Sequence, residues 1–569
     1  MTAMPASPDD TDLGPTDTGT PETPHQASRL WRRELNHYPA TSRRMAYLAI
    51  VVLTTVVLYY ALYVQYAVAT SIITHFHMTY SYFVWVSVIG NAVGAFASLV
   101  AGLADRWGRA NMVVYGLLIA ALLSLLGLPN APDKGTYLVL FAGLSFIEGI
   151  VLVATPALIR DFSPQLGRAT AMGYWTMGPV IGSLVVTVVT SSTLSFAGWQ
   201  DELRYSGWAG LAVFMLALLG LHELSPRLRD QIMVSLRDRA LIEARAKGAN
   251  QRTAAAGHWR QMLRLDVVGS ATAVSLFLLL YFGAVGNFVV YFAATFGYSE
   301  QRTNGLANWY WAANAVALVA AGLLSDKLKV RKPFMIVGAV GSIVVTTLFA
   351  LHATEPRTGY YTFAALFVAI GVLTGVTYAP WMASFTETVE KQNPAATATG
   401  LAVWGWIIRA VVAVSTAFVP VVVTSATPLV EHGAQVKAAS VQAAPALAII
   451  DAHPRLFAEL EAYPPAAVPP ALAAQAAREV GDDDLATVRR AQPQLALLQR
   501  YGSQVKNAAA QGPEQWRTWW LICVAGQVIF LPFIFVMAGR WSPRKARDEA
   551  VEHQRAVDRE LAALAEEGD

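Results

Sequence analysis

Twelve long apolar stretches constrain the fold of this chain more than any other feature. They run approximately over residues 45–70, 82–104, 111–128, 136–158, 169–194, 206–222, 266–294, 304–325, 333–352, 359–385, 396–424 and 516–539. A helix needs about 20 mostly apolar residues to cross a bilayer. Composition agrees, because 55% of the residues are hydrophobic and 14% are charged, whereas roughly 25% are charged in soluble domains. The sequence therefore predicts an all-α membrane protein with twelve transmembrane helices.

The loops between these stretches alternate in positive charge. Lysine and arginine residues gather before the first stretch, after the second, fourth and eighth, and after the twelfth, whereas each opposite short loop holds at most one. Positively charged loops stay on the cytoplasmic side of a membrane. We therefore expect a multi-pass protein of the cytoplasmic membrane with both termini in the cytoplasm.

The spacing of the stretches suggests five parts. We expect a disordered cytoplasmic tail, a six-helix bundle, cytoplasmic linker helices, a second six-helix bundle and a cytoplasmic C-terminal tail, at residues 1–44, 45–222, 223–265, 266–540 and 541–569. An extracytoplasmic insertion with helical stretches occupies residues 425–515. A loop of this length is either functional, an appended small domain, or a tolerated insertion of helical hairpins.

Short motifs repeat six helices apart. The run "AGLADRWGRAN" (101–111) follows the second stretch and "AGLLSDKLKVRK" (321–332) follows the eighth. On a twelve-helix chain with a long central loop, this pattern resembles the major facilitator superfamily, over about residues 45–540 without the insertion. The resemblance implies two pseudo-symmetric six-helix bundles, with a substrate site near the midplane between them.

Subfamily signals point in two directions. The run "ELSPR" (223–227) resembles part of a sugar-porter motif, and "GPVIGS" (178–183) resembles part of a drug–proton antiporter motif. The closing motif of the sugar porters is absent, and Ser145 stands where the antiporters carry an arginine. Close helix packing and a kink explain the second run better, so neither subfamily can be assigned.

The repeated loops are candidates for gating. The resemblance implies that they latch the cytoplasmic side shut when the cavity faces outward. A tight turn favours Gly108, and Asp105 can face a helix N-terminus and an arginine of the other bundle. Ordinary cytoplasmic charge is the alternative. The predicted gating residues are Asp105, Arg106, Gly108, Arg109, Asp326 and Lys327.

Two ionisable residues lie at mid-depth in the predicted helices. Glu148 is about 12 residues into the fourth stretch, and Arg409 is about 13 residues into the eleventh, within "VWGWIIRAVVAV" (403–414). Such residues cost roughly 2.5–3.5 kcal/mol at the helix centre and usually mark function. Burial favours the neutral form of a carboxyl group and a nearby cation favours the charged form. Glu148 is therefore a candidate proton carrier, with a structural hydrogen bond as the alternative. Arg409 suits an anionic substrate, Glu148 itself or helix carbonyls.

Uncharged polar and aromatic residues accompany this pair. In the superfamily that the chain resembles, helices 1, 4, 7 and 10 line the cavity. We therefore predict that the cavity is lined by Tyr63, Tyr66, Asn287, Tyr378 and Trp381. Packing or a place in the interfacial aromatic belt is the alternative for each ring.

No enzymatic or cofactor-binding motif is visible, and with one cysteine no cysteine metal cluster can form. The net charge of +3 gives no indication of nucleic-acid binding. We predict a monomeric secondary transporter without a cofactor, whose partners are protons, lipid and a small solute. Proton-coupled symport of an organic anion or polar metabolite is the first hypothesis. Proton-driven efflux of amphipathic compounds is the second, and a receptor or assembly protein built on a transporter fold is the third.

Overall fold

The computed structural model describes residues 33–99, 108–162, 174–225, 262–355, 357–392, 397–464 and 468–544, with Leu228, Val551, Arg555 and Arg559. Within these residues, twelve helices are long and apolar enough to cross a membrane. They confirm the predicted class of all-α membrane protein. The predicted N-terminal tail up to residue 32 and most of the linker and C-terminal tail lie outside the described residues.

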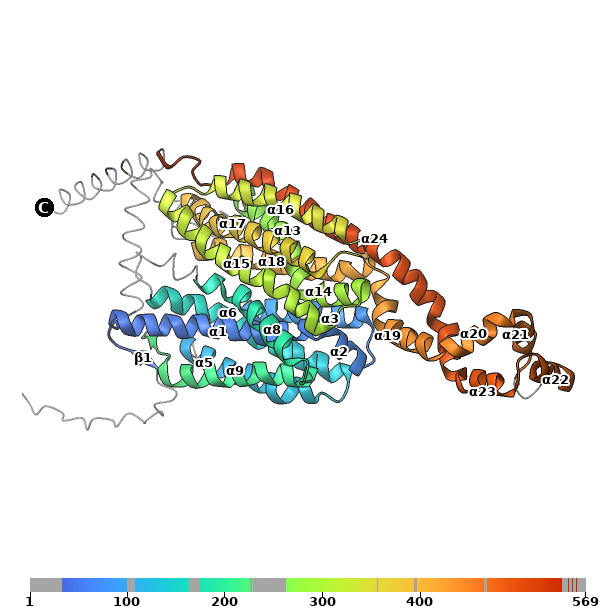
Figure 1. The fold of residues 1–569 in the computed structure, drawn as a ribbon. Helices are drawn as coiled ribbons and strands as arrows, with labels where there is room; N and C mark the ends of the chain where they lie inside the picture. The colour runs from blue at the N-terminus through green and yellow to red at the C-terminus, as the bar shows by residue number, and fades with distance from the viewer. Residues whose placement is uncertain are drawn as a thin grey trace, which may run out of the picture.

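The first half of the chain forms one bundle (Figure 1). Its elements are β1 (Glu34–Leu35), α1 (Thr41–Ala67), α2 (Ala69–His75), α3 (Tyr80–Leu99), α5 (Arg109–Leu122), the π-helical turn η2 (Leu123–Gly127), the 3₁₀ turn η3 (Leu128–Asn130), α6 (Lys134–Phe162), α8 (Gly178–Thr193), α9 (Trp199–Gly220) and β2 (Glu223–Leu224). β1 pairs in parallel with β2, so the start of the described chain lies beside the end of this bundle.

The second half lies alongside the first, from α13 in green to α24 in red in Figure 1. Its membrane elements are the π-helical turn η4 (Leu265–Gly269), α13 (Ser270–Phe277), α14 (Leu279–Phe296), α15 (Glu300–Leu328), α16 (Lys332–His352), α17 (Tyr360–Gln392), α18 (Thr397–Val422) and α24 (Gln492–Val536). The predicted seventh helix is thus interrupted at Leu278, between α13 and α14.

The insertion forms a helical stalk that projects beyond one end of the two bundles (Figure 1). It comprises α19 (Ala426–Gln442), α20 (Ala444–Ala452), α21 (Pro454–Glu461), α22 (Pro470–Glu479), α23 (Asp482–Arg490) and the first part of α24. The last membrane helix begins at residue 492 rather than at 516, because α24 runs for 45 residues from the stalk into the bundle. We call this end of the molecule the stalk end.

Aromatic residues fill the interior of the second half. Tyr291 is fully buried and lies 5.3 Å from Trp520, measured between ring centroids. Phe288 stacks on Phe367 at 4.7 Å and meets Phe349 at 6.1 Å. Such ring pairs stabilise helix packing beyond the area that they bury. This cluster joins α14, α16, α17 and α24 into one body, and α14 in turn contacts α1 of the first half.

Candidate functional site

A cavity of about 210 Å³ lies between the two halves. Helices α1, α3, α6 and α8 line it from the first half, and α14, α15, α17 and α18 line it from the second. Six of the seven predicted substrate and coupling residues are among its lining residues, namely Tyr63, Tyr66, Glu148, Asn287, Tyr378 and Arg409. The folded chain therefore brings residues from five different helices to one space.

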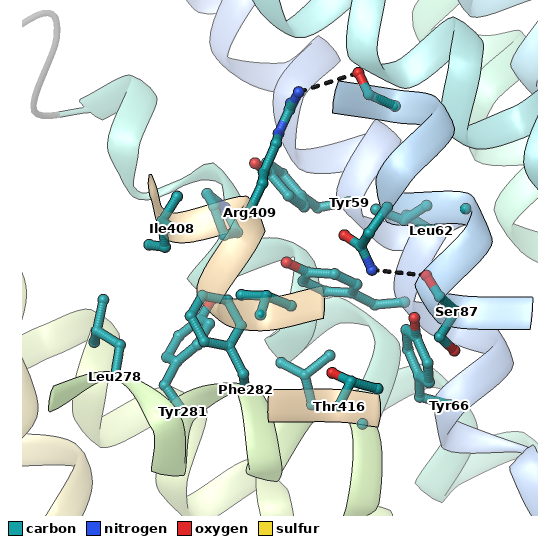
Figure 2. Close-up of a pocket in the computed structure, with 18 of the residues that line it drawn as sticks. Tyr59, Leu62, Tyr66, Ser87, Leu278, Tyr281, Phe282, Ile408, Arg409 and Thr416 are labelled. Carbon is teal, nitrogen blue, oxygen red and sulfur yellow. Dashed lines mark hydrogen bonds between the residues drawn. The ribbon is translucent and has the colours of Figure 1, made fainter. Parts of the chain in front are cut away.

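Arg409 enters the cavity from α18 and reaches across to the first half. Its Nη1 donates a hydrogen bond to the backbone carbonyl oxygen of Gly94 in α3, at 3.1 Å (Figure 2). A guanidinium group carries five N–H donors, and this is the one hydrogen bond that Arg409 makes among the described residues. The other nitrogens are not enclosed by protein, so donors remain for a group inside the cavity.

Glu148 approaches the same turn of α3 from α6. Its side chain is 7% exposed, and its Oε2 lies 3.6 Å from the position that a Cβ on Gly94 would occupy. Within the described part of the chain it has no cation within 4.0 Å, so it does not form an ion pair with Arg409. Glu148 and Arg409 therefore both lie next to Gly94, but they do not pair directly with each other.

Glycine at two positions makes this meeting possible. A Cβ on Gly149 of α6 would lie 2.3 Å from the carbonyl oxygen of Gly94, and a Cβ on Gly94 would lie 3.0 Å from the carbonyl oxygen of Ser145. Small residues let transmembrane helix backbones approach closely. The resulting contact between α3 and α6 places the Gly94 carbonyl where the Arg409 side chain can reach it.

A wall of tyrosines forms one side of the cavity. Tyr59, Tyr63 and Tyr66 share one face of α1 at the spacing i, i+4, i+7, with successive centroids 5.2 and 6.3 Å apart. Tyr66 meets Phe83 of α3 edge to face at 6.2 Å. Tyr281 projects from α14 on the opposite side (Figure 2). The cavity surface therefore combines aromatic rings with aliphatic and polar side chains.

Two amides add fixed polarity to this wall. Tyr80 donates its hydroxyl to Oδ1 of Asn287 at 2.9 Å, which leaves the Asn287 NH₂ group as a donor. Asn91 donates to the backbone carbonyl of Ser87 at 2.9 Å (Figure 2), which leaves its own oxygen as an acceptor. Asn91 is not among the predicted lining residues, although a lone amide in the apolar stretch 82–104 was a usable signal.

Trp381 does not line the cavity. It is fully buried, and it stacks on Tyr378 at 5.9 Å and on Phe385 at 5.0 Å. It lies behind Tyr378 as a packing residue. The prediction of a lining role for Trp381 does not fit this geometry, whereas Tyr378 of the same helix faces the cavity.

The first gating loop is described only from Gly108, so Asp105 and Arg106 lie outside the described residues. Gly108 has φ = +89°, a backbone conformation that side chains rarely adopt. Arg109 then starts α5. Its Nη1 pairs with both carboxylate oxygens of Asp161 at 2.8 and 3.0 Å, and its backbone N–H donates to Glu223 at 2.8 Å. The loop is thus held against the cytoplasmic end predicted for α6.

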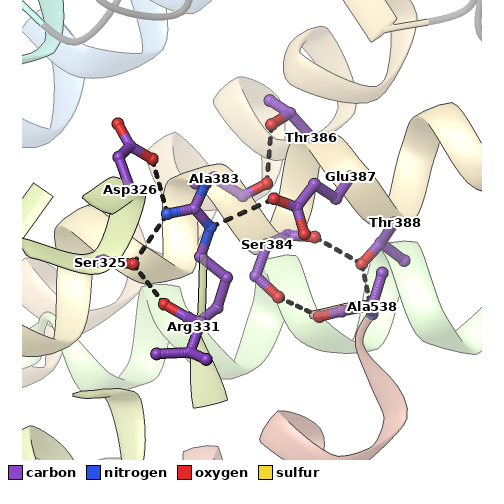
Figure 3. A network of polar contacts seen from close by, with 10 residues as sticks. Ser325, Asp326, Arg331, Ala383, Ser384, Thr386, Glu387, Thr388 and Ala538 are labelled. Atoms are coloured by element: carbon purple, nitrogen blue, oxygen red, sulfur yellow. Dashed lines mark hydrogen bonds and ion pairs between the residues drawn. The ribbon is translucent and has the colours of Figure 1, made fainter. Parts of the chain in front are cut away.

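The second gating loop is organised by Arg331 rather than by Lys327. Arg331 pairs with Asp326 at 2.7 Å and with Glu387 of α17 at 3.1 Å (Figure 3). It also donates to Ser325 Oγ at 2.8 Å. Lys327 is exposed and has no ion pair or hydrogen bond among the described residues. In each half, an arginine near the start of the third membrane helix therefore pairs with a carboxylate near the end of the fourth. The pairs are Arg109 with Asp161 and Arg331 with Glu387.

These features define a multi-pass membrane transporter, with two similar six-helix bundles around a central cavity. Residues 51–413, more than half of the chain, match the Major Facilitator Superfamily. The chain therefore belongs to this superfamily of transporters, as the repeated loops suggested.

Solved structures with a similar fold include a bacterial homologue of the human lysosomal transporter Spinster. Its inward-facing unoccupied form aligns at a TM-score of 0.57 and 15% identity, over 89% of this chain and 100% of that one. Its inward-facing occupied form aligns at 0.53 and 16%, over 87% and 97%. At this identity the likeness concerns the fold alone.

A curated relative is the quinolone resistance protein NorB of Staphylococcus aureus (strain bovine RF122 / ET3-1). It is 28% identical over 137 residues. The match covers 24% of this chain and 28% of the relative, so it spans less than a third of either protein.

Proposed function

We propose that this protein is a secondary active transporter of the cytoplasmic membrane that carries a small organic anion in symport with protons. Arg409 and Glu148 both line the cavity and both lie next to Gly94. This arrangement supports the proposal most. The guanidinium offers donors to an anionic group of the solute. The carboxyl can take up a proton in the same cavity, since the two groups are not locked in an ion pair.

The rest of the cavity suits a solute with an apolar or aromatic body. Tyr59, Tyr63 and Tyr281 provide ring surface, and Asn287 provides a donor on the wall. A polar anchor within a mostly apolar pocket is the usual arrangement of small-molecule sites. We infer that the solute places its anionic group near Arg409 and its body between α1 and α14.

Proton-driven export of amphipathic compounds is the second candidate. The aromatic wall favours it, because such surfaces accept many apolar bodies without directional contacts. The short match to a protein named for quinolone resistance is compatible with it. The two candidates differ in the direction of proton movement relative to the solute, and this direction can be measured.

The deciding experiment uses purified protein in liposomes that contain a pH-sensitive dye. Organic acids and amphipathic cations are added one at a time, and proton flux is recorded with each solute. Proton movement in the direction of the solute supports symport, and movement against it supports export by exchange. The absence of solute-dependent proton flux with any transported solute would reject both couplings.

Glu148→Gln tests the coupling site in the same liposomes. Glutamine resembles the protonated carboxyl and cannot release a proton. Uphill accumulation driven by a pH gradient should vanish, while exchange of labelled solute across the membrane should continue. Glu355→Gln, in an exposed loop position, is the matched control and should keep both activities. Continued pH-driven accumulation by Glu148→Gln would show that Glu148 is not the coupling site.

A further inference from the structure

Glu300 joins the two halves at the stalk end of the molecule. It is the first residue of α15, in the second half. Its Oε1 accepts hydrogen bonds from Thr70 Oγ1 at 2.5 Å and from the Ser71 backbone N–H at 2.8 Å. Its Oε2 accepts a hydrogen bond from Ser71 Oγ at 2.6 Å. All three donors belong to the first turn of α2, in the first half.

Further contacts along α15 reinforce this junction. Asn304 donates to the carbonyl oxygen of Ala67 at 2.8 Å. Asn308 donates to Ser191 Oγ at 3.0 Å, and Gln301 donates to the Ser191 carbonyl at 3.1 Å. Residues 300, 304 and 308 are spaced i, i+4, i+8 and share one face of α15. This face of α15 therefore contacts the first half over more than two helical turns.

A second, small pocket lies between the cavity and this junction. It shares Tyr63, Tyr66 and Val285 with the cavity, and it also contacts Asn304 and Ala307 of α15. The route between the halves thus continues past the tyrosines toward the stalk end. There it reaches Asn304, which lies one helical turn after Glu300 on α15.

We propose that the Glu300 carboxylate is the clasp that holds the stalk end of the transport route shut. An ionised carboxylate only accepts hydrogen bonds, and every donor that Glu300 uses through its side chain comes from the other half. In the described part of the chain no cation lies within 4.0 Å of it. Separation of the halves must therefore break all three bonds together, and water must replace them. This proposal depends on neither the solute nor the coupling ion.

The clasp can open without leaving any of its polar groups unpaired. Its partners are two hydroxyl groups and one N–H, which water can match once the halves separate. Such a junction can hold the resting state closed and still release during a transport cycle. Glu300 is accordingly a positioning residue and need not touch the solute.

Cysteine labelling tests the proposal on the full-length protein. Cys523, the one cysteine of the chain, is replaced by alanine, and Ala307→Cys places a reporter in the small pocket, where residue 307 is 4% exposed. A membrane-impermeant maleimide is applied to the stalk side of intact membranes. A separate Val441→Cys variant, at a stalk residue that is 69% exposed, verifies that the reagent reaches that side.

Glu300→Ala and Glu300→Gln should raise the labelling rate of the reporter. The expected increase is about ten-fold or more for Glu300→Ala, the factor that corresponds to one lost charge-assisted hydrogen bond. Glu300→Gln should give a smaller increase, because its amide oxygen still accepts. Ser71→Ala removes one of the three donors and should also give a smaller increase. Ser71→Ala therefore still tests the proposal if Glu300→Ala does not fold.

Arg302→Gln is the matched control on the same helical turn. Arg302 lies over the ring of Tyr298 at 4.3 Å and near that of Tyr360, both within the second half, so its loss should leave the labelling rate unchanged. Parental labelling rates in folded Glu300→Gln and Ser71→Ala would overturn the proposal. An equal increase in Arg302→Gln would overturn it as well, because the effect would then be general loosening.

Discussion

Replacement of Arg409 by glutamine should weaken solute binding and loosen the contact between α18 and α3. In the structure the guanidinium donates to the Gly94 carbonyl at 3.1 Å, and Arg409 lines the cavity. Glutamine is shorter and uncharged, so it loses both the backbone contact and the donors for an anion. Two separate quantities should therefore change in one variant.

The magnitudes follow from the kind of bond that is lost. A hydrogen bond to a charged group contributes about 1.5–3 kcal/mol. Loss of one such bond to an anionic solute lowers affinity by about 10- to 150-fold at 1.4 kcal/mol per decade. Loss of the bond to Gly94 should lower the thermal stability of the solute-free protein. Arg409→Lys should restore affinity in part, because a single ammonium does not reproduce the planar fork of the guanidinium.

The assay is equilibrium binding of a transported solute to purified Arg409→Gln over a range of pH. Thermal unfolding of the solute-free variant is recorded beside it. Lower stability with unchanged affinity at every pH would mean that Arg409 serves only the Gly94 contact. That result would refute its role in binding the solute.

Two further substitutions test the packing around the site and the second gating loop. Gly149→Ala places a methyl group 2.3 Å from the Gly94 carbonyl and should destabilise the protein by about 1–3 kcal/mol in thermal unfolding. Gly143→Ala on the same helix, with 3.9 Å of space, should be neutral, and equal effects would contradict the packing argument. Arg331→Gln breaks two ion pairs and a hydrogen bond and should lower stability by about 1–2 kcal/mol. Lys327→Gln should not lower it, and the reverse order would be inconsistent with the contacts seen here.

The twelve helices were predictable because the bilayer sets a minimum apolar length. Glu148 and Arg409 were predictable for a related reason, since a charge in an apolar helix is costly and must face protein or a cavity. Gly94 carries no such signal. Its contribution is a backbone carbonyl, which every residue has, and its position depends on how closely α3 and α6 pack.

Side-chain direction was harder to predict than helix position. Trp381 is three residues after Tyr378, a rotation of about 60° around the helix axis with a rise of about 4.5 Å. That offset is enough to place the Tyr378 side chain in the cavity lining and the Trp381 side chain behind Tyr378. Arg331 was missed for a different reason. The repeated motif contains Asp326 and Lys327, so these two residues were predicted. In the structure the chain turns at Lys329, which has φ = +56°, and this turn brings Arg331 back to Asp326.

The contact between Arg409 and Gly94 suggests how solute binding could move the two halves. It joins α18 of one half to α3 of the other, and it uses a donor of the group proposed to bind the solute. A charge-assisted bond between guanidinium and an anion is stronger than one to a neutral carbonyl. An anionic solute that draws the guanidinium into the cavity would therefore break this hydrogen bond between α18 and α3. Under the proposed function, solute binding is then coupled to the loss of this contact between the halves at mid-depth, while the Glu300 contacts hold the stalk end independently.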